Sequence, residues 1–495
     1  MDQHTPVRVR FAPSPTGSTH IASGRTALYN YLLARQTGGK FILRIEDTDQ
    51  KRYVPGAEKE LIDSLHWLGI DWDEGPGVGG PNGPYYQTQR RDIYQEYAVR
   101  LIESGHAYYC FCTPERLENV RKEQISHKEN PRYDGLCRRL DPGEATARVS
   151  RGERHVVRFK VPKTGSLTAH DLLRGDITVE NSALDDHIIV RSDGLALYHL
   201  AAMVDDHLMG ITHVIRGSEW LSTFPLHVHI IRAFEWQEPQ WVHLSVFLKP
   251  SGKGKMSKRD ASQVIQDGHS IYIKDLDSLG FIPEGVANWI ALMGWSFDDH
   301  TEFFTLQDLI EIFNLAHLNP SPAAINFSKL DYFNGLHIRN LTREDLAHRL
   351  APYLIKAGYP LDEDKLYLAI PIIRERLVTL DDVIPVAGFF FKEGVTPDPN
   401  NLVAEGLTSA ESATIARKAY QILASLPQIT KDIAEPPLRN FVDESGFKAG
   451  QVFGLLREAV TGQKSSPPLF ETMEIIGKDK VLERIQSAID TLERM

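Results

Sequence analysis

The sequence predicts an α/β protein in which a doubly wound domain with an insertion precedes a region made only of helices. Residues 7–11 alternate between apolar and polar side chains, as a half-buried strand does, and a helical pattern follows at 26–34. A second, mainly apolar strand is expected at 41–45, and an amphipathic helix at 57–68. Such alternation of strands and helices is typical of a parallel sheet, whereas the sequence beyond Leu330 has almost wholly the pattern of amphipathic helices.

The later elements follow in order along the chain. The Gly- and Pro-rich stretch 74–84 is expected to be a loop, because a helical pattern resumes at Tyr85. Strand-like segments follow at 155–161 and 188–190. They lie with all three cysteines in a stretch of different character, which indicates an insertion, and 286–293 again has a helical pattern.

Length and composition exclude several classes of protein. At 495 residues the chain is too long for one hydrophobic core, and three to five domains are expected. No stretch approaches about eighteen consecutive apolar residues and no signal-peptide layout is present, so no membrane contact is expected. Three cysteines argue against a disulfide scaffold and favour a cytoplasmic location. The net charge of −11 weakly opposes a nucleic-acid partner, although local placement of cations decides such binding.

The first turn has the features of an anion site. A strand, a small-residue turn and a helix start form the corner where backbone N–H groups and the helix dipole favour phosphates. The glycines follow neither the dinucleotide spacing nor the P-loop pattern. The turn instead contains His20, whose imidazole can donate to a phosphate without a permanent charge.

A second candidate segment is the loop from Lys249 to Arg259, which combines five cations with two glycines and two serines. It follows the apolar run 241–248, so a mobile basic loop is expected to leave the edge of a sheet there. Such a loop can fold over a polyphosphate and stabilise charge as a phosphoanhydride breaks. Taken alone, the segment is better explained as a solvated basic surface loop.

Together the two segments resemble the paired ATP motifs of class I aminoacyl-tRNA synthetases. His20-Ile-Ala-Ser23 stands in the place of His-Ile-Gly-His, and Lys255-Met-Ser-Lys-Arg259 matches Lys-Met-Ser-Lys-Ser/Arg. Four further blocks, in the same order, resemble bacterial glutamyl-tRNA synthetase: Arg10-Phe-Ala-Pro-Ser-Pro-Thr-Gly17, Leu43-Arg-Ile-Glu-Asp-Thr-Asp49, Val204-Asp-Asp-His-Leu-Met-Gly210 and Val214-Ile-Arg-Gly-Ser-Glu-Trp220.

The resemblance implies a domain plan. A Rossmann-type catalytic domain is expected in two halves, 1–108 and 195–260, around an acceptor-stem-binding α+β insertion at 109–194; a connecting domain is expected at 261–330, and two helical anticodon-binding lobes at 331–393 and 394–495. Arginine and aromatic side chains commonly read unpaired bases. By position, Arg374, Arg376 and Arg457 are the candidates for contact with the anticodon.

The implied reaction joins L-glutamate to a tRNA. The glutamate carboxylate attacks the α-phosphorus of ATP and releases pyrophosphate, and the acyl group then passes to the terminal ribose of tRNA-Glu. Positioning and charge stabilisation carry the phosphorus step, with Mg²⁺ screening the phosphates. The resemblance assigns catalysis to His20, Lys255 and Lys258, and ATP binding to His20, Ser23, Glu219, Trp220, Lys255, Met256, Ser257, Lys258 and Arg259. It further implies a monomer that requires tRNA for glutamate activation, and it leaves open whether tRNA-Gln is also charged.

A glutamate pocket must hold two carboxylates and one ammonium group. Arginine forks suit carboxylates, and an acidic side chain suits the ammonium. The matched positions are Arg10 and Arg216 for the carboxylates and Glu46 for the ammonium, with Ala12, Ser14 and Tyr198 beside them.

Three positions depart from the family pattern. Ala22 replaces the glycine after His-Ile, and Ser23 follows it, so an added methyl group could crowd ATP. The residue after Tyr198 is His199. Ala202 stands where some relatives carry asparagine, which removes one potential contact with glutamate.

The cysteines have the spacing of a zinc site that some relatives carry. Cys110, Cys112 and Cys137 supply three thiolates, but Arg139 stands where the fourth ligand, a histidine, is usual. Tyr133 or His127 could complete a tetrahedron. The alternative is a remnant without zinc, in which the cysteines are small apolar fillers.

Three other functions are alternatives to the tRNA-ligase function that the resemblance implies. A nucleotidylyltransferase of the same fold would not need the helical third of the chain. A shortened relative that modifies a tRNA base lacks an anticodon domain, so the length excludes it. A non-catalytic paralogue would fit the change at Ala22 and Ser23, but the intact Lys-Met-Ser-Lys-Arg sequence argues against it.

Overall fold

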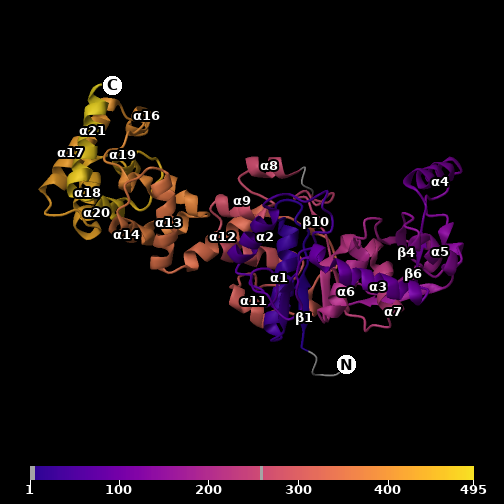
Figure 1. Ribbon diagram of the computed structural model, residues 1–495. Coiled ribbons are helices and arrows are strands. Elements are labelled where there is room, and N and C mark those ends of the chain that lie inside the picture. Colours follow the sequence, from indigo (N-terminus) through magenta and orange to yellow (C-terminus); the bar gives the residue numbers. More distant parts are fainter. Residues whose placement is uncertain (1–5, 257–259) are drawn as a thin grey trace. The chain divides into compact units, whose positions relative to one another are not determined.

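The protein folds into two compact units (Figure 1). The computed structural model describes residues 6–256 and 260–495. One unit contains the residues up to Leu276 together with Val286–Phe327, and the other contains Asp277–Gly285 together with Ser328–Met495. Among the described helices, none has the length and apolar character that crossing a membrane requires.

The first unit starts with a strand–helix–strand motif. Strands β1 (Arg8–Phe11) and β2 (Lys40–Leu43) pair in parallel on either side of α1 (Ile21–Gln36). The side chains of Phe41, Ile42 and Leu43 are fully buried, as expected for a parallel strand covered on both faces.

A second parallel pair completes the doubly wound arrangement that the sequence predicts. Strand β8 (His213–Gly217) pairs with β9 (Gln240–Leu244), and the amide of Thr212 donates to the carbonyl oxygen of Arg8 at 2.9 Å. This bond places the start of β8 beside β1. The carboxyl ends of β1 and β8 therefore lie at one edge, where such sheets bind their ligands.

The insertion forms its own small sheet and also extends the larger one. Strands β3 (Ala107–Cys110), β4 (Val156–Phe159) and β7 (Ile188–Val190) pair antiparallel. The hairpin of β5 (Ser166–Asp171) and β6 (Gly175–Glu180) joins the other sheet, where Asp171 pairs with Trp241 in the order β6-β5-β9-β8. The insertion is thus tied to the nucleotide fold through β5.

The other helical segments up to residue 317 are α2 (Ala57–Trp67), η1 (Gln87–Arg90), α3 (Arg91–Glu103), α4 (Pro114–Ser126), η2 (Cys137–Arg139), α5 (Pro142–Ser150), η3 (Asn181–Ala183), α6 (Tyr198–Leu208), η4 (Ser218–Ser222), α7 (Phe224–Ala233), α8 (Ala261–Gln266), α9 (Ile273–Ser278), α10 (Pro283–Leu292), α11 (Leu306–Ile312) and η6 (Leu315–His317). Strands β10 (Phe247–Leu248) and β11 (Ala323–Ala324) pair in parallel. This pairing groups much of the expected connecting domain with the first unit.

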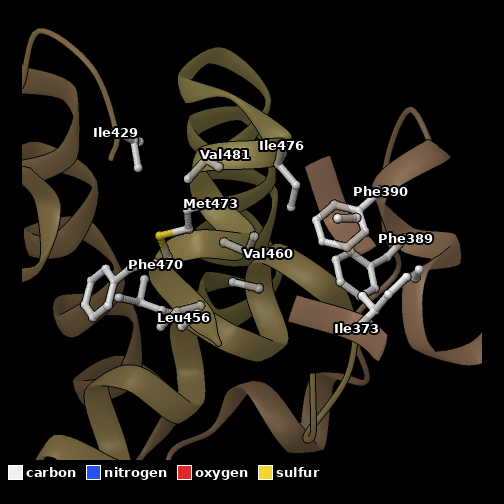
Figure 2. Packing of buried hydrophobic residues seen from close by; sticks show 14 of the residues in the cluster. Ile373, Phe389, Phe390, Ile429, Leu456, Val460, Phe470, Met473, Ile476 and Val481 are labelled. Atoms are coloured by element: carbon white, nitrogen blue, oxygen red, sulfur yellow. The ribbon is translucent and has the colours of Figure 1, made fainter. Parts of the chain in front are cut away.

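The second unit is helical, as the sequence predicts. Its helical segments are α12 (Phe327–Asn340), α13 (Arg343–Lys356), α14 (Glu363–Ile373), η7 (Arg374–Arg376), η8 (Leu380–Asp382), α15 (Val383–Ala387), η9 (Gly388–Phe391), α16 (Pro399–Leu402), α17 (Ser409–Ser425), α18 (Lys431–Ser445), α19 (Ala449–Thr461), α20 (Leu469–Ile476) and α21 (Lys478–Glu493). Figure 2 shows Phe389 and Phe390 in the same apolar core as Val460 and Ile476. The two expected lobes therefore share one core.

Candidate active site

One cavity of about 660 Å³ opens at the carboxyl ends of β1 and β8. Each described residue that the sequence assigns to ATP or glutamate lines it: Arg10, Ala12, Ser14, His20, Ser23, Glu46, Tyr198, Arg216, Glu219, Trp220, Lys255 and Met256. Ser257, Lys258 and Arg259 lie outside the described residues. Residues as far apart in the sequence as Arg10 and Met256 thus converge on a single site.

His20 caps helix α1. Its Nδ1 accepts a hydrogen bond from the amide of Ala22 at 3.0 Å. In the neutral ring the proton therefore lies on Nε2. The helix begins at Ile21, earlier than the helical pattern at 26–34 indicates, because the cap and the small residues after it carry no apolar periodicity. A helix start and an imidazole N–H are both suited to binding an anion.

Arg10 is held by a buried aspartate. Its Nε and Nη2 donate to the two carboxylate oxygens of Asp206 at 3.0 and 3.3 Å. Arg44 also donates to Asp206, at 2.8 Å, so two arginines share one carboxylate. Sequence reasoning missed these roles of Asp206 and Arg44, although both lie inside the quoted blocks. The available signal was a pair of adjacent acids in an otherwise apolar helix, α6.

Glu46 belongs to the same buried cluster. Its Oε1 accepts from Arg44 Nη2 at 3.2 Å. Burial raises the pKa of Glu46 to about 7, against the lowering effect of Arg44 and Arg10. A further partner with positive charge, such as a substrate ammonium group, would favour the ionised form of this carboxyl.

Arg216 has a different environment. Its Nε donates to Nε2 of His243 at 3.0 Å, and its Nη2 donates to Nδ1 of His227 at 3.0 Å. Its Nη1 is buried and has no hydrogen-bond partner among the described residues. Beside it, the rings of Tyr198 and Trp220 stack with their centroids 4.0 Å apart. A buried donor without an acceptor at a cavity wall is suited to an anionic ligand.

The three departures from the family pattern have distinct places. Ala22 lies in the first turn of α1 and lines the cavity together with Ser23. Nδ1 of His199 lies 2.9 Å from Nε2 of His227. Ala202 is fully buried and is not among the cavity-lining residues.

The described part of the basic loop is a tight hairpin. The amide of Lys249 donates to Gly254 O at 3.0 Å, and the amide of Met256 donates to Phe247 O at 2.9 Å. Gly254 has a φ of +79°, which only glycine adopts easily. Met256 is buried and Lys255 is exposed, so the chain is anchored just where it presents Lys255 to the cavity.

The three cysteines of the insertion come together. Their sulfur atoms lie within 4.8 Å of one another. The hydroxyl oxygen of Tyr133 lies 3.5 Å from Cys110 Sγ and 3.6 Å from Cys112 Sγ. Hydrogen bonding from Cys137, with a further bond from Tyr133, lowers the pKa of the Cys110 thiol to about 4. Of the two fourth ligands considered, Tyr133 lies at the sulfurs, whereas His127 ends helix α4 in an exposed position.

The three arginines assigned to the anticodon differ in exposure. Arg374 donates to the carbonyl oxygens of Arg339 and Leu341, and Arg457 donates to those of Ser466 and Pro467. Arg376 is exposed. Arg376 makes one long hydrogen bond, from Nη1 to Ser465 Oγ at 3.5 Å, whereas the other two guanidinium groups donate to backbone carbonyl oxygens of the helical unit.

Comparison with known proteins covers nearly the whole chain. The family described as tRNA synthetases class I (E and Q), catalytic domain, matches residues 6–332, and an anticodon binding domain matches residues 345–489. A glutamate–tRNA ligase of Dehalococcoides mccartyi is 43% identical over 99% of both chains, and that of Borreliella burgdorferi is 44% identical over 98% of this chain and 99% of its own. A crystal structure of a glutamate tRNA ligase from Elizabethkingia meningosepticum in complex with its amino acid has a TM-score of 0.90 at 34% identity, and it covers 99% of this chain and 100% of its own.

Proposed function

The chain belongs to the glutamate–tRNA ligases of the class I tRNA synthetases, and on this premise we propose a role for each side of its cavity. The enzyme activates L-glutamate with ATP and transfers it to tRNA. In the first step a glutamate α-carboxylate oxygen bonds to the α-phosphorus of ATP, and the bond to pyrophosphate breaks. In the second step a ribose hydroxyl of the terminal adenosine attacks the acyl carbon, and AMP leaves.

The ATP side of the cavity is formed by the start of α1 and the basic loop. His20 donates to the phosphates from Nε2, and Lys255 and Lys258 stabilise the charge that gathers on the departing pyrophosphate. ATP enters as its Mg²⁺ complex. The cap that fixes Nδ1 of His20 as an acceptor and the place of Lys255 on the cavity wall support this assignment.

The amino-acid side is formed by the buried charges. Glu46 receives the α-ammonium group, with Arg10 close to it in the same cluster. The ammonium and the α-carboxylate share one carbon atom, so both lie near Glu46. The side chain of glutamate then extends to Arg216, which receives the γ-carboxylate. The unpartnered Nη1 of Arg216 is the observation that carries this assignment.

For the insertion we propose a zinc ion held by Cys110, Cys112, Cys137 and Tyr133. The donor set fits: three sulfur atoms lie within 4.8 Å of one another, and a phenol oxygen lies near two of them. When bound, zinc would stabilise the fold of the insertion and take no part in the reaction. All three cysteines are free thiols, which suits the cytoplasmic location expected from the sequence.

The partners follow from the two matched domains. We propose that a monomer takes tRNA-Glu, with the acceptor end at the insertion and the anticodon at the helical unit. Of the three candidate arginines, Arg376 is the most exposed and is the first candidate for a base contact. Arg374 and Arg457 are partly buried and are the weaker candidates.

The test is aminoacylation of two purified tRNAs, with ATP–pyrophosphate exchange measured with and without tRNA. We expect charging of tRNA-Glu, and exchange only when tRNA is present. Charging of tRNA-Gln as well would make the enzyme non-discriminating. Exchange without charging of either tRNA would favour an adenylating enzyme of another kind.

A further inference from the structure

A chain of buried side chains runs behind the glutamate end of the cavity. Asp171 Oδ2 lies 2.7 Å from His243 Nδ1, and His243 Nε2 accepts from Arg216 Nε at 3.0 Å. On the other side Arg216 Nη2 donates to His227 Nδ1 at 3.0 Å, and His227 Nε2 lies 2.9 Å from His199 Nδ1. Five different elements, β5, β9, β8, α7 and α6, supply these residues.

The donors of Arg216 determine the state of both adjacent histidines. A guanidinium group has only donors, so each imidazole nitrogen that faces it must be an acceptor. His243 therefore carries its proton on Nδ1 and donates it to Asp171. His227 carries its proton on Nε2 and donates it to His199. Both rings are neutral in this arrangement.

The surroundings keep these rings neutral. Burial lowers the pKa of His227 well below its usual value, and the neighbouring Arg216, His199, His243 and Arg10 lower it further. Burial also lowers the pKa of His243 to about 4, against the hydrogen bond that its ring donates to Asp171, while Arg216 and Arg174 add to the lowering. The pKa of His199 falls to about 4 through burial, with smaller effects from His187 and Arg216.

The charge of Arg216 is therefore left without a carboxylate partner. Arg10 and Arg44 both donate to Asp206, which compensates part of their charge. Among the described residues, no carboxylate makes an ion pair with Arg216. Burial lowers the pKa of Arg216, Tyr198 opposes this lowering through its charge and a side-chain hydrogen bond, and Asp206 opposes it to a smaller extent. Nη1, the nitrogen that neither histidine holds, is the one without a partner.

We propose that His243 and His227 are specificity-determining positioning residues for the amino acid. As neutral acceptors they fix the Arg216 guanidinium, and they leave its charge to the γ-carboxylate of glutamate. An uncharged γ-amide, as in glutamine, gives a hydrogen bond but not the compensating charge, so the site rejects it. This inference rests on the proposed role of Arg216.

Paired amide substitutions separate an acceptor role from a structural one. At position 243 the side-chain oxygen of Gln can take the place of Nε2, whereas that of Asn falls at Nδ1 and cannot reach Arg216. At position 227 the relation is reversed, because Asn places its oxygen at Nδ1 and Gln places it near Nε2. We expect His243→Gln and His227→Asn to keep the glutamate KM within about 3-fold of the wild type, since the contact to Arg216 survives.

The opposite pair, His243→Asn and His227→Gln, should raise the glutamate KM at least 10-fold while the ATP KM stays constant. The assay is aminoacylation of tRNA-Glu with either substrate varied. His229→Gln is the matched control on α7, because His229 bonds to Asn181 and not to Arg216. If both substitutions at each position have the same effect on the glutamate KM, the acceptor role is wrong.

A further variant, His227→Asp, tests whether Arg216 must lack a carboxylate partner, because it places a carboxylate against the guanidinium group. The ratio of kcat/KM for glutamate to that for glutamine should fall at least 10-fold. An unchanged ratio in a folded variant would overturn the proposal, and the amide pairs decide the matter if the variant does not fold. Arg216→Ala identifies failures of the underlying assignment: a normal glutamate KM there contradicts the proposed function itself, whereas a raised KM with indistinguishable amide pairs contradicts only the role of the histidines.

Discussion

Arg216 and His243 are direct neighbours on the paired strands β8 and β9, and the guanidinium Nε donates to the imidazole Nε2 across 3.0 Å. Both side chains are buried. Because the register of two parallel strands places these residues side by side, the sheet itself sets the geometry of the arginine that we propose binds the γ-carboxylate. A loop would not hold a buried cation in this way without further partners.

Lys258 lies outside the described residues, and its role is predicted from the sequence. Lys258→Ala should slow adenylate formation by two or more orders of magnitude, because losing one charge-stabilising contact commonly costs about 3–4 kcal/mol in the transition state. The measurement is tRNA-dependent ATP–pyrophosphate exchange. Lys253→Ala is the control, since Lys253 is exposed in the same loop and does not line the cavity. A variant with normal kcat and only a raised glutamate KM would contradict the role at pyrophosphate.

Glutamate use should depend on pH through Glu46. Burial raises the pKa of this carboxyl to about 7, and only the ionised form attracts the α-ammonium group. The glutamate kcat/KM should therefore rise as pH increases through about 7, while the ATP KM stays nearly constant. Glu46→Gln should lower glutamate kcat/KM and remove this rise. The same pH profile in that variant would assign the titration to another group.

Metal analysis tests the zinc site. The purified protein should contain about one zinc per chain, and Cys110→Ser should lose it, because a structural zinc needs four ligands. Tyr133→Phe should weaken zinc retention against a chelator, whereas His127→Ala, at the exposed end of α4, should not. A fully active, metal-free protein prepared without chelators would exclude a structural requirement.

Ala22→Gly tests the clearest departure from the family pattern. The ATP KM should stay within about 2-fold, and stability should fall by about 0.5–1 kcal/mol, because glycine costs more entropy in a helix. If the methyl group instead crowded the nucleotide, its removal would relieve overpacking. A tenfold or larger fall in the ATP KM would establish that second case.

Much of the fold and of the cavity could be predicted from local sequence. The strand at 7–11 and the turn with His20 are contiguous signals, and the blocks that contain Arg10, Glu46 and Arg216 each resemble a family motif. The partners of these residues could not be predicted in the same way. His243 lies in the run 241–248, which indicates only a buried strand, and its contacts Asp171 and Arg216 come from strands that pair with β9 only in the folded sheet.

The helical unit gives two further examples of contacts that local sequence does not predict. An arginine on a helix surface carries no local sign of its partners, so Arg374 and Arg457 could not be distinguished in advance from the exposed Arg376. The common core of the two expected helical lobes depends on contacts such as those of Phe389 and Phe390 with residues far along the chain. The partners of the arginines depend on tertiary hydrogen bonds, and the common core depends on burial. Neither property appears as a periodic pattern in the sequence.

Selection of glutamate by Arg216 is tested most directly by the KM values for glutamate and ATP of Arg216→Ala, obtained from aminoacylation of tRNA-Glu. Removing one partner of a buried charge pair commonly costs about 3–5 kcal/mol. We therefore expect the glutamate KM to rise at least a hundredfold and the ATP KM to stay within about 2-fold. A raised ATP KM with an unchanged glutamate KM would contradict selection of glutamate by Arg216.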